Sequence, residues 1–195
     1  MTNKNPIITA FAAAALAVLA LSCSKSEIQN AYSQQDKDIE SIVSSLAPEG
    51  SEATVDYLDG AVRVTVKHGE GDALGKSGTV SFFYAGHRIT GTSLNVENLF
   101  ATNNKELAET YAWTVSDTTV FKEVTVDLSK ESLVKGLKKG IVGVKSGDEC
   151  YILFNGKLGF GNHTTGKVPA NSGLAYHLWI CLLYTSPSPR DLSTS

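Results

Sequence analysis

The stretch Gly156-Lys-Leu-Gly-Phe-Gly-Asn-His-Thr-Thr-Gly-Lys-Val-Pro-Ala-Asn-Ser-Gly-Leu-Ala-Tyr176 is a glycine-rich loop that leads into a strand pattern. The loop contains a single Val168-Pro169 step, and hydrophobic residues alternate with others from Leu174 to Ile180. A loop of this length, restrained by a proline and followed by an aromatic residue on a strand face, is more typical of a pocket wall than of a simple connection. The sequence therefore predicts a pocket beside this last strand.

Hydrophobic residues that alternate with polar ones predict the other strands of a sheet. Val62, Val64 and Val66, for example, alternate with charged and hydroxyl residues. We expect strands at residues 62–66, 79–85, 121–128, 149–154 and 174–180, with Val80, Phe82 and Tyr84 on one face of the second and with Val124, Val126 and Leu128 facing inward in the third.

Two short helices are expected between these strands. One begins near Asn103, whose side chain can cap it, with Glu106 three residues later as in a capping box, and it runs to about Trp113. The other covers residues 132–139 and ends at Gly140. Several strands with few helices indicate an α+β domain built on an antiparallel sheet.

The N-terminal residues 1–22 have the pattern of a signal peptide. Lys4 precedes an apolar run from Ile7 to Leu21, which is short for a membrane-spanning helix. The run ends in Ala20-Leu21-Ser22-Cys23, which resembles a bacterial lipoprotein signal. We expect lipidation at Cys23 and a stable anchor in the bacterial cell envelope, on the outer membrane and facing the periplasm or the surface. An ordinary secretory signal with a coincidental cysteine is the alternative.

Residues 23–50 are expected to form a tether with a helical part. Ile39, Ile42, Val43 and Leu46 have the i, i+3, i+4, i+7 spacing of one apolar helix face. This helix is a stalk or a small docking helix, and a dimerisation helix is a further alternative. The folded domain is then expected at residues 51–180.

The C-terminal residues 181–195 change composition abruptly. This Ser/Pro-rich segment resembles a tail that adapter read-through leaves on unrelated assembled sequences, and a disordered native tail is the alternative. Of the three cysteines, Cys23 and Cys181 lie outside the expected domain, and Cys150 lies within it. We therefore expect no disulfide within the domain.

Charge and motif spacing exclude several functions. The formal net charge is −3, and Lys135, Lys138 and Lys139 form a small cluster on a helix face rather than a basic stripe, so nucleic acid is not an expected partner. The segment 69–77 has neither the glycine spacing nor the following helix of a phosphate-binding loop. The four histidines lack metal-ligand spacing, and His177 is expected on the surface. We expect neither a metal nor a cofactor.

Four segments, in matching order and spacing, resemble the FKBP-type peptidyl-prolyl isomerases, above all bacterial lipoprotein members. They lie between about residues 60 and 180. The segments are Phe83-Tyr84-Ala85-Gly86, Leu133-Val134-Lys135-Gly136-Leu137, Gly143-Val144-Lys145-Ser146-Gly147-Asp148, and Phe160-Gly161 followed by Val168-Pro169, Leu174 and Tyr176. The resemblance implies an FKBP-like fold, in which an antiparallel β-sheet wraps around a short α-helix, preceded here by the helical extension.

The resemblance also implies which residues form the pocket. Residues at the catalytic positions are Tyr84, Phe100, Leu133, Val134, Phe160, Val168 and Tyr176. Three further pocket positions differ from the family: Ala101 replaces an aspartate, Leu137 a tryptophan and Val124 a phenylalanine. Phe160 replaces a tyrosine that hydrogen-bonds the peptide, so the pocket is expected to be apolar with fewer polar groups. An insertion at about residues 104–119 brings Tyr111 and Trp113 toward the rim.

The expected function is isomerisation of X-Pro bonds in exported proteins. The reaction needs no proton transfer, because its barrier of about 18–20 kcal/mol comes from amide resonance. A dry pocket complementary to the twisted amide lowers that barrier, so activity is plausible without the aspartate. The altered pocket also fits a peptide-binding chaperone without turnover. A third hypothesis is an envelope interaction protein that keeps the fold as a scaffold.

Overall fold

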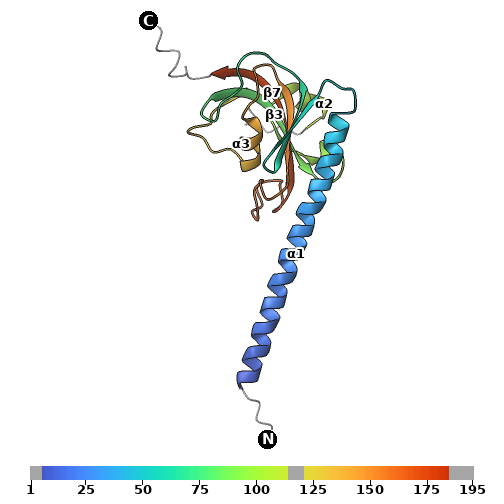
Figure 1. The fold of residues 1–195 in the computed structure, drawn as a ribbon, viewed down its shortest axis with the longest axis vertical. Coiled ribbons are helices and arrows are strands. Elements are labelled where there is room, and N and C mark those ends of the chain that lie inside the picture. Colours follow the sequence, from blue (N-terminus) through green and yellow to red (C-terminus); the bar gives the residue numbers. More distant parts are fainter. Residues whose placement is uncertain (1–5, 114–120, 185–195) are drawn as a thin grey trace.

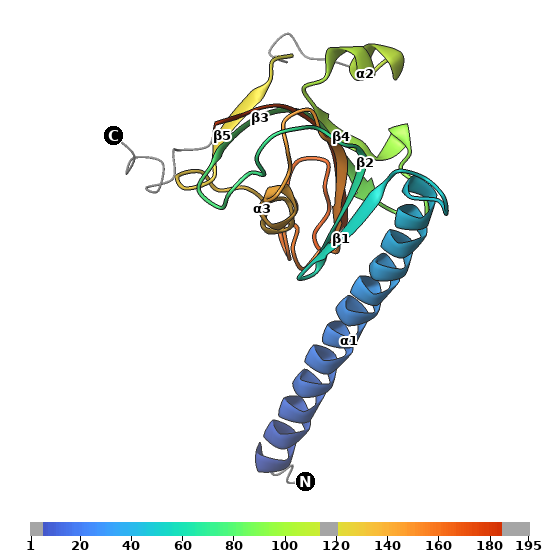
Figure 2. The same ribbon diagram turned by 45° about the horizontal axis from the view of Figure 1, so that its top comes forward.

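The computed structural model describes the chain over residues 6–113 and 121–184, with side chains from residue 25 to residue 183 inside those ranges. A strongly curved antiparallel sheet surrounds one short helix, and a long helix lies against the outer side of the sheet (Figures 1 and 2). The elements are α1 (Pro6–Leu46), β1 (Thr54–Leu58), β2 (Ala61–Lys67), β3 (Thr79–Ile89), η1 (Val96–Asn98), β4 (Leu99–Thr102), α2 (Lys105–Thr110), β5 (Val124–Asp127), α3 (Lys135–Ile141), β6 (Glu149–Phe154) and β7 (Gly173–Tyr184).

The sheet has the order β1-β2-β6-β7-β3-β4, and β5 also pairs with β3. Every pairing is antiparallel. The long central pair runs from Thr79 opposite Tyr184 to Ile89 opposite Gly173, with a bulge between Ser81 and Phe82. This architecture confirms the predicted α+β fold with an antiparallel sheet wrapped around a short helix.

Two hydrophobic cores fill the two faces of the sheet. The inner core lies between the sheet and α3 and includes Val80, Phe82 and Phe154. The outer core lies under the C-terminal part of α1, where Ile42 packs with residues such as Val64 of β2. The predicted alternation of valines in β2 is present, but Val62, Val64 and Val66 face α1 rather than α3.

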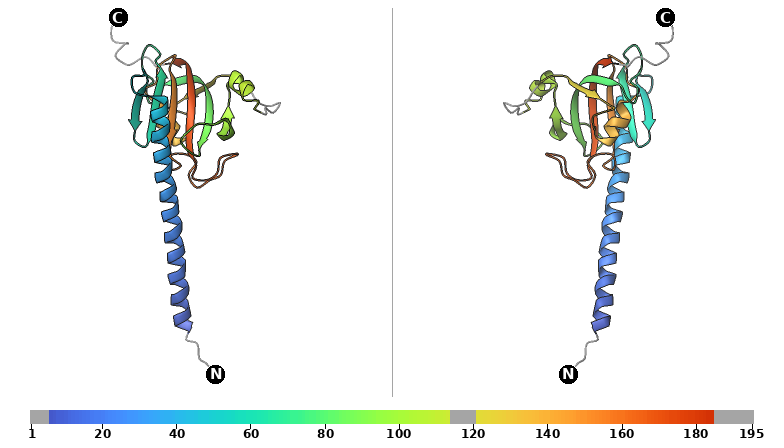
Figure 3. Two further views of the ribbon diagram at one scale, coloured as in Figure 1. Left: turned by 90° about the vertical axis from the view of Figure 1, so that its right-hand side faces the viewer. Right: turned by 90° about the vertical axis from the view of Figure 1, so that its left-hand side faces the viewer.

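Helix α1 is therefore a docking helix in its C-terminal part, while its N-terminal part projects away from the sheet (Figures 1 and 3). It also holds the loop between β6 and β7. The hydroxyl of Tyr32 donates to Oδ1 of Asn171 over 2.7 Å, and Nε2 of Gln35 donates to the Asn171 carbonyl over 2.8 Å. The Gly156 N–H donates to Oε1 of Gln35 over 2.9 Å. Both ends of the glycine-rich loop are thus hydrogen-bonded to α1.

The short helices differ from the predicted ones at their ends. Asn104, not Asn103, caps α2, because its side chain accepts the Leu107 N–H. Asn103 is buried instead, and its amide joins the Tyr84 N–H to the Lys122 carbonyl. The other helix, α3, begins three residues later than predicted, at Lys135, and continues past Gly140 to Ile141.

The last strand also differs from its predicted bounds. It extends beyond Ile180 to Tyr184, because β3 offers pairing partners as far as Thr79. Residues 181–184 of the predicted tail therefore lie in β7. The remaining residues of that tail, 185–195, lie outside the described residues.

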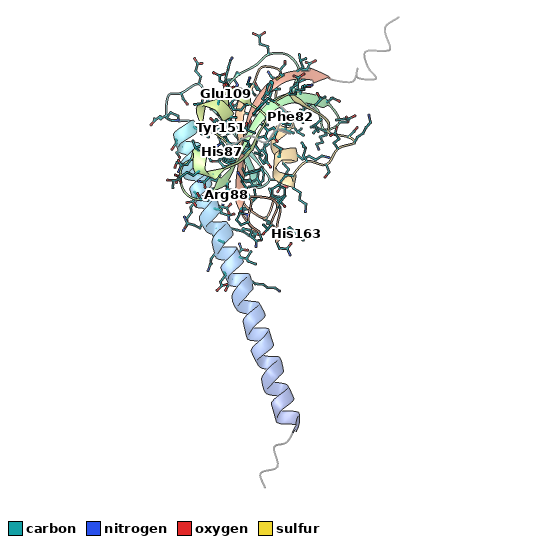
Figure 4. All side chains as sticks on the ribbon, turned by 180° about the vertical axis from the view of Figure 1, so that it is seen from behind. Phe82, His87, Arg88, Glu109, Tyr151 and His163 are labelled. Atoms are coloured by element: carbon teal, nitrogen blue, oxygen red, sulfur yellow. The ribbon has the colours of Figure 1, made fainter. Side chains whose placement is uncertain are left out.

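The outer face of the sheet carries a histidine cluster that corrects one prediction. His177 is not on the surface: its ring stacks on Tyr151 at 4.0 Å, lies 3.8 Å from the Trp179 ring, and hydrogen-bonds Glu149 over 2.8 Å. His87 is only 6 % exposed, and its Nδ1 has no hydrogen-bond partner among the described residues. Figure 4 shows His87 near Tyr151 on the side crossed by α1.

We predict that His87 makes the domain acid-sensitive. Burial, and secondarily the nearby His177, lower its pKa to about 4, from an ordinary value of 6.5. Between these two pH values His87 binds a proton in the unfolded chain but not in the folded chain. The contribution of neutral, buried His87 to stability is therefore fully present above pH 6.5 and is lost as the pH falls toward 4. Replacing His87→Leu should reduce the loss of unfolding free energy between pH 7 and pH 4.5 by about 2 kcal/mol, measured by urea denaturation.

His163→Leu is the control, because that side chain is exposed in the folded protein. Its pH dependence should match that of the unmodified protein. Equal acid sensitivity of His87→Leu and the unmodified protein would show that His87 does not carry the effect.

Candidate functional site

A hollow of about 280 Å³ lies between the inner face of the sheet and the start of α3. Strands β3, β4 and β7 supply its aromatic walls, and the segment leading into α3 supplies aliphatic residues. The residues that line it are Phe82, Tyr84, Phe100, Ala101, Val124, Ser132, Leu133, Val134, Leu137 and Tyr176.

Tyr176 lies at the centre of the aromatic walls. Its ring centroid is 5.9 Å from that of Phe100 in an edge-to-face arrangement, and 6.4 Å from that of Tyr84. Behind it, the Phe154 ring is stacked at 6.0 Å with an interplanar angle of 19°. Offset and edge-on ring pairs at these distances are favourable, so the walls are held in place by their own contacts.

The position of α3 depends on a contact between a glycine and the Phe154 ring. A Cβ built on Gly136 would lie 2.2 Å from Cγ of Phe154, so only a glycine allows the helix to approach the ring this closely. The Gly136 N–H also donates to the Leu158 carbonyl over 3.0 Å. These contacts place Val134 and Leu137 opposite the aromatic walls, because both lie within two residues of Gly136.

The polar groups of the hollow are hydroxyls rather than carboxylates. Burial raises the pKa of Tyr84 and of Tyr176, so both hydroxyls keep their protons at neutral pH. Among the described residues, neither hydroxyl has a hydrogen-bond partner. Ser132 adds a third hydroxyl, while Ala101 supplies no polar side-chain atom. The lining therefore suits an apolar group flanked by hydrogen-bond acceptors.

The structure brings eight of the predicted pocket residues into this lining: Tyr84, Phe100, Ala101, Val124, Leu133, Val134, Leu137 and Tyr176. Two others lie elsewhere. Val168 is 1 % exposed in the inner core, and Phe160 packs against that core from the loop. Val124 is 37 % exposed at the edge of the hollow, rather than facing fully inward.

Two lining residues were missed by the sequence interpretation. Phe82 shares its strand face with Val80 and Tyr84, so the alternation in β3 was a signal for it. Ser132 immediately precedes Leu133 and lies outside the regular elements. No pattern in the sequence distinguishes it.

The insertion after Phe100 contacts the glycine-rich loop. It forms α2, and the Lys167 Nζ lies 5.4 Å from the centroid of the Trp113 ring. Tyr111 is 36 % exposed. Residues 114–119 of the insertion lie outside the described residues. The loop thus contacts Trp113, which follows α2, and is hydrogen-bonded to α1.

No group of three or more His, Cys, Asp or Glu side chains within the described residues could hold a metal ion. Figure 4 shows His163 well away from His87. In the same part of the chain, no helix is long and apolar enough to cross a membrane.

Comparison with known proteins shows what this fold is similar to. Residues 97–180 match the model of the family described as FKBP-type peptidyl-prolyl cis-trans isomerase. The fold is similar to the crystal structure of FkpA from Escherichia coli, with a TM-score of 0.54, 18 % identity, and coverage of 95 % of this chain and 76 % of that one. No curated protein sequence matches significantly.

Two more solved structures have the same fold. The N-terminal domain of FKBP42 from Arabidopsis thaliana has a TM-score of 0.51 and 17 % identity, covering 71 % of this chain and 98 % of that one. The peptidyl-prolyl cis-trans isomerase of Pseudomonas syringae pv. tomato has a TM-score of 0.52 and 14 % identity, covering 78 % and 95 %. The fold is thus that of FKBP domains, and residues 97–180 match the model of the FKBP-type family.

We predict that Gly136→Ala destabilises the domain and distorts the hollow. The added methyl would collide with Phe154, which is fully buried and stacked on Tyr176. Overpacking costs about 1–3 kcal/mol, and the gain of about 1 kcal/mol in helix propensity offsets only part of it at so short a distance. Urea denaturation should show a net loss of about 1–2 kcal/mol.

Gly91→Ala is the matched control, because a Cβ there meets nothing within 4 Å. Its unfolding free energy should change by less than about 0.5 kcal/mol. If the two variants were equally stable, the Gly136 contact would not control the position of α3.

Proposed function

We propose that this protein is a peptidyl-prolyl cis-trans isomerase that acts on X-Pro bonds of exported proteins. The observation that carries the proposal is the aromatic and aliphatic hollow of about 280 Å³ around Tyr84, Phe100, Val134 and Tyr176. It lies in a domain whose residues 97–180 match the FKBP-type isomerase family. A proline ring is compact and apolar, and the hollow offers it four hydrophobic walls.

The proposed mechanism is stabilisation of the twisted amide without covalent chemistry. A planar amide has partial double-bond character and separated charge, and twisting the bond removes both. An apolar site with little water therefore favours the twisted form over the planar one. Because no proton moves, the lack of a carboxylate at Ala101 does not stop the reaction.

The two tyrosine hydroxyls are proposed to hold the peptide backbone. Tyr84 and Tyr176 are protonated donors with no partner among the described residues, and both line the hollow. A hydrogen bond from either to a peptide carbonyl next to the proline would orient the X-Pro bond over Phe100. In this proposal the hydroxyls take over polar contacts that the family places at the positions of Ala101 and Phe160.

We predict that the full-length protein accelerates cis-to-trans exchange of a proline peptide in a protease-free NMR assay. Uncatalysed exchange takes tens to hundreds of seconds, so a modest acceleration is measurable. Tyr176→Phe should lower kcat/KM by about 2- to 10-fold, which corresponds to the loss of one hydrogen bond of about 0.5–1.5 kcal/mol. Tyr57→Phe, on an exposed strand, should leave the rate unchanged.

A peptide-binding chaperone without turnover is the alternative, and it follows from the loss of the carboxylate at Ala101. An exchange rate equal to that of buffer alone would exclude the isomerase. Suppression of aggregation by that same inactive protein, reduced by Phe100→Ala, would then support the chaperone.

We propose in addition that the protein is exported and anchored in the bacterial envelope by lipid on Cys23. The support is the sequence pattern Ala20-Leu21-Ser22-Cys23 at the end of an apolar run. Two or more acyl chains give stable membrane attachment, whereas a single chain gives only reversible binding.

Cys23→Ser should move the protein from the membrane fraction to the soluble fraction of bacterial cells and abolish incorporation of labelled fatty acid. Ser24→Ala is the control and should leave both unchanged. A Cys23→Ser protein that still sediments with the membrane and takes up label would contradict the lipid anchor.

A further inference from the structure

A second, larger hollow lies on the other side of the segment that leads into α3. It has a volume of about 800 Å³, within the range typical of ligand sites. The turn between β1 and β2, the loop between β2 and β3, and one side of α3 surround it; Figure 2 shows these segments together. We call it the lysine groove, and it is lined by Leu58, Asp59, Lys76, Ser132, Leu133, Lys135, Lys138, Lys139 and Val142.

The groove has a charge opposite to that of the whole protein. Four lysines and one aspartate line it, whereas the chain has a formal net charge of −3. Lys139 pairs with Asp59, and Lys138 donates to the Leu128 carbonyl over 3.0 Å. Lys76 and Lys135 are exposed and have no partner among the described residues. The groove therefore keeps two cations available to an anionic ligand.

The floor of the groove is apolar. Leu58, Leu133 and Val142 lie between the lysines, and the methylene stems of the lysines extend this apolar surface. A ligand that uses both features carries carboxylates together with aliphatic or aromatic side chains. An extended acidic peptide has this composition, and it fits a concave groove better than the flat surface of a bilayer does.

The groove adjoins the aromatic hollow. Both Ser132 and Leu133 line the groove on one side and the hollow on the other. A peptide with its proline against Tyr176 would therefore pass over Ser132 and Leu133 into the groove within a few residues, since an extended chain spans about 3.3 Å per residue. Because the two sites are adjacent, the occupant of the groove that fits best is a flanking segment of the peptide whose proline lies in the hollow.

We propose that the lysine groove binds an acidic segment flanking the proline of the substrate, so that the protein prefers X-Pro bonds near Glu or Asp residues. The inference rests on the proposed isomerase for its link to catalysis, but the groove itself can be tested without turnover. Charges at the edge of a binding site act mainly on the rate of encounter and on selectivity. The preference is therefore expected to lower KM for acidic peptides and to leave kcat unchanged.

The test compares two sets of proline peptides. In one set a segment of Glu and Leu residues flanks the proline, on its N-terminal or its C-terminal side. In the other set Gln replaces each Glu. With full-length protein in the NMR exchange assay, KM should be about 3- to 10-fold lower for the better-placed Glu flank than for its Gln counterpart. Adding about 0.5 M salt should remove most of this difference, because it screens exposed charges.

Lys76→Glu combined with Lys135→Glu should abolish or reverse the preference and leave turnover of the Gln peptides unchanged, because neither lysine lines the aromatic hollow. Lys135→Glu also places an acidic residue at the start of α3, where it is favourable. The matched control, Lys37→Glu with Lys67→Glu, makes the same change of net charge outside the groove and should keep the preference.

Binding of the Glu-flanked peptide with Ala in place of Pro, followed by fluorescence anisotropy, separates the two proposals. Lysine-dependent binding without any exchange activity would support the proposed peptide site in the groove and contradict the proposed isomerase. Exchange activity with equal KM for Glu and Gln flanks would support the isomerase and contradict the peptide site in the groove. Equal KM together with Lys76- and Lys135-dependent binding to phosphatidylglycerol vesicles would also overturn it, in favour of a lipid surface.

Discussion

The contact between the Phe154 ring and the backbone of Gly136 is the constraint on which the pocket depends. The ring is fully buried, with α3 on one side and Tyr176 stacked on the other. Because a side chain at Gly136 would occupy the same space as the ring, the helix can approach the sheet only with glycine there. That approach brings Leu137 and Val134 opposite the aromatic walls, and the hollow is the space that remains between them.

The outer face of the sheet is as much a part of the domain as the inner one. Ile39, Ile42 and Val43 of α1 bury the valines of β2, and Gln35 holds both ends of the loop between β6 and β7. The same helix contains the proposed lipid site, Cys23, in its N-terminal half. The C-terminal part of this helix is thus hydrogen-bonded to the loop that contains Phe160 and Val168.

The chemistry of the hollow is consistent with a reaction that needs no acid or base. Its polar groups are the protonated hydroxyls of Tyr84 and Tyr176 and the hydroxyl of Ser132. In the proposed reaction such groups would orient a peptide, while the apolar walls would favour a twisted amide. The lysine groove next to it adds charge without entering the hollow, because Ser132 and Leu133 separate the two sites. The apolar lining and the lysines are therefore in different places.

The sequence by itself determined the α+β class and five of the seven strands in the described residues, because alternation is a local pattern, whereas β1 and β4 were not predicted. The resemblance to FKBP sequences, rather than alternation, predicted that Tyr84, Phe100 and Tyr176 line one hollow. Tertiary structure decided the rest. The start of α3 at Lys135 depends on packing against β6, and the burial of His177 depends on stacking with Tyr151 of the neighbouring strand. Val168 lies in the core rather than in the hollow, because the loop between β6 and β7 turns back there, with two backbone hydrogen bonds between Thr165 and Val168. Such contacts join residues far apart in the chain, and no local pattern encodes them.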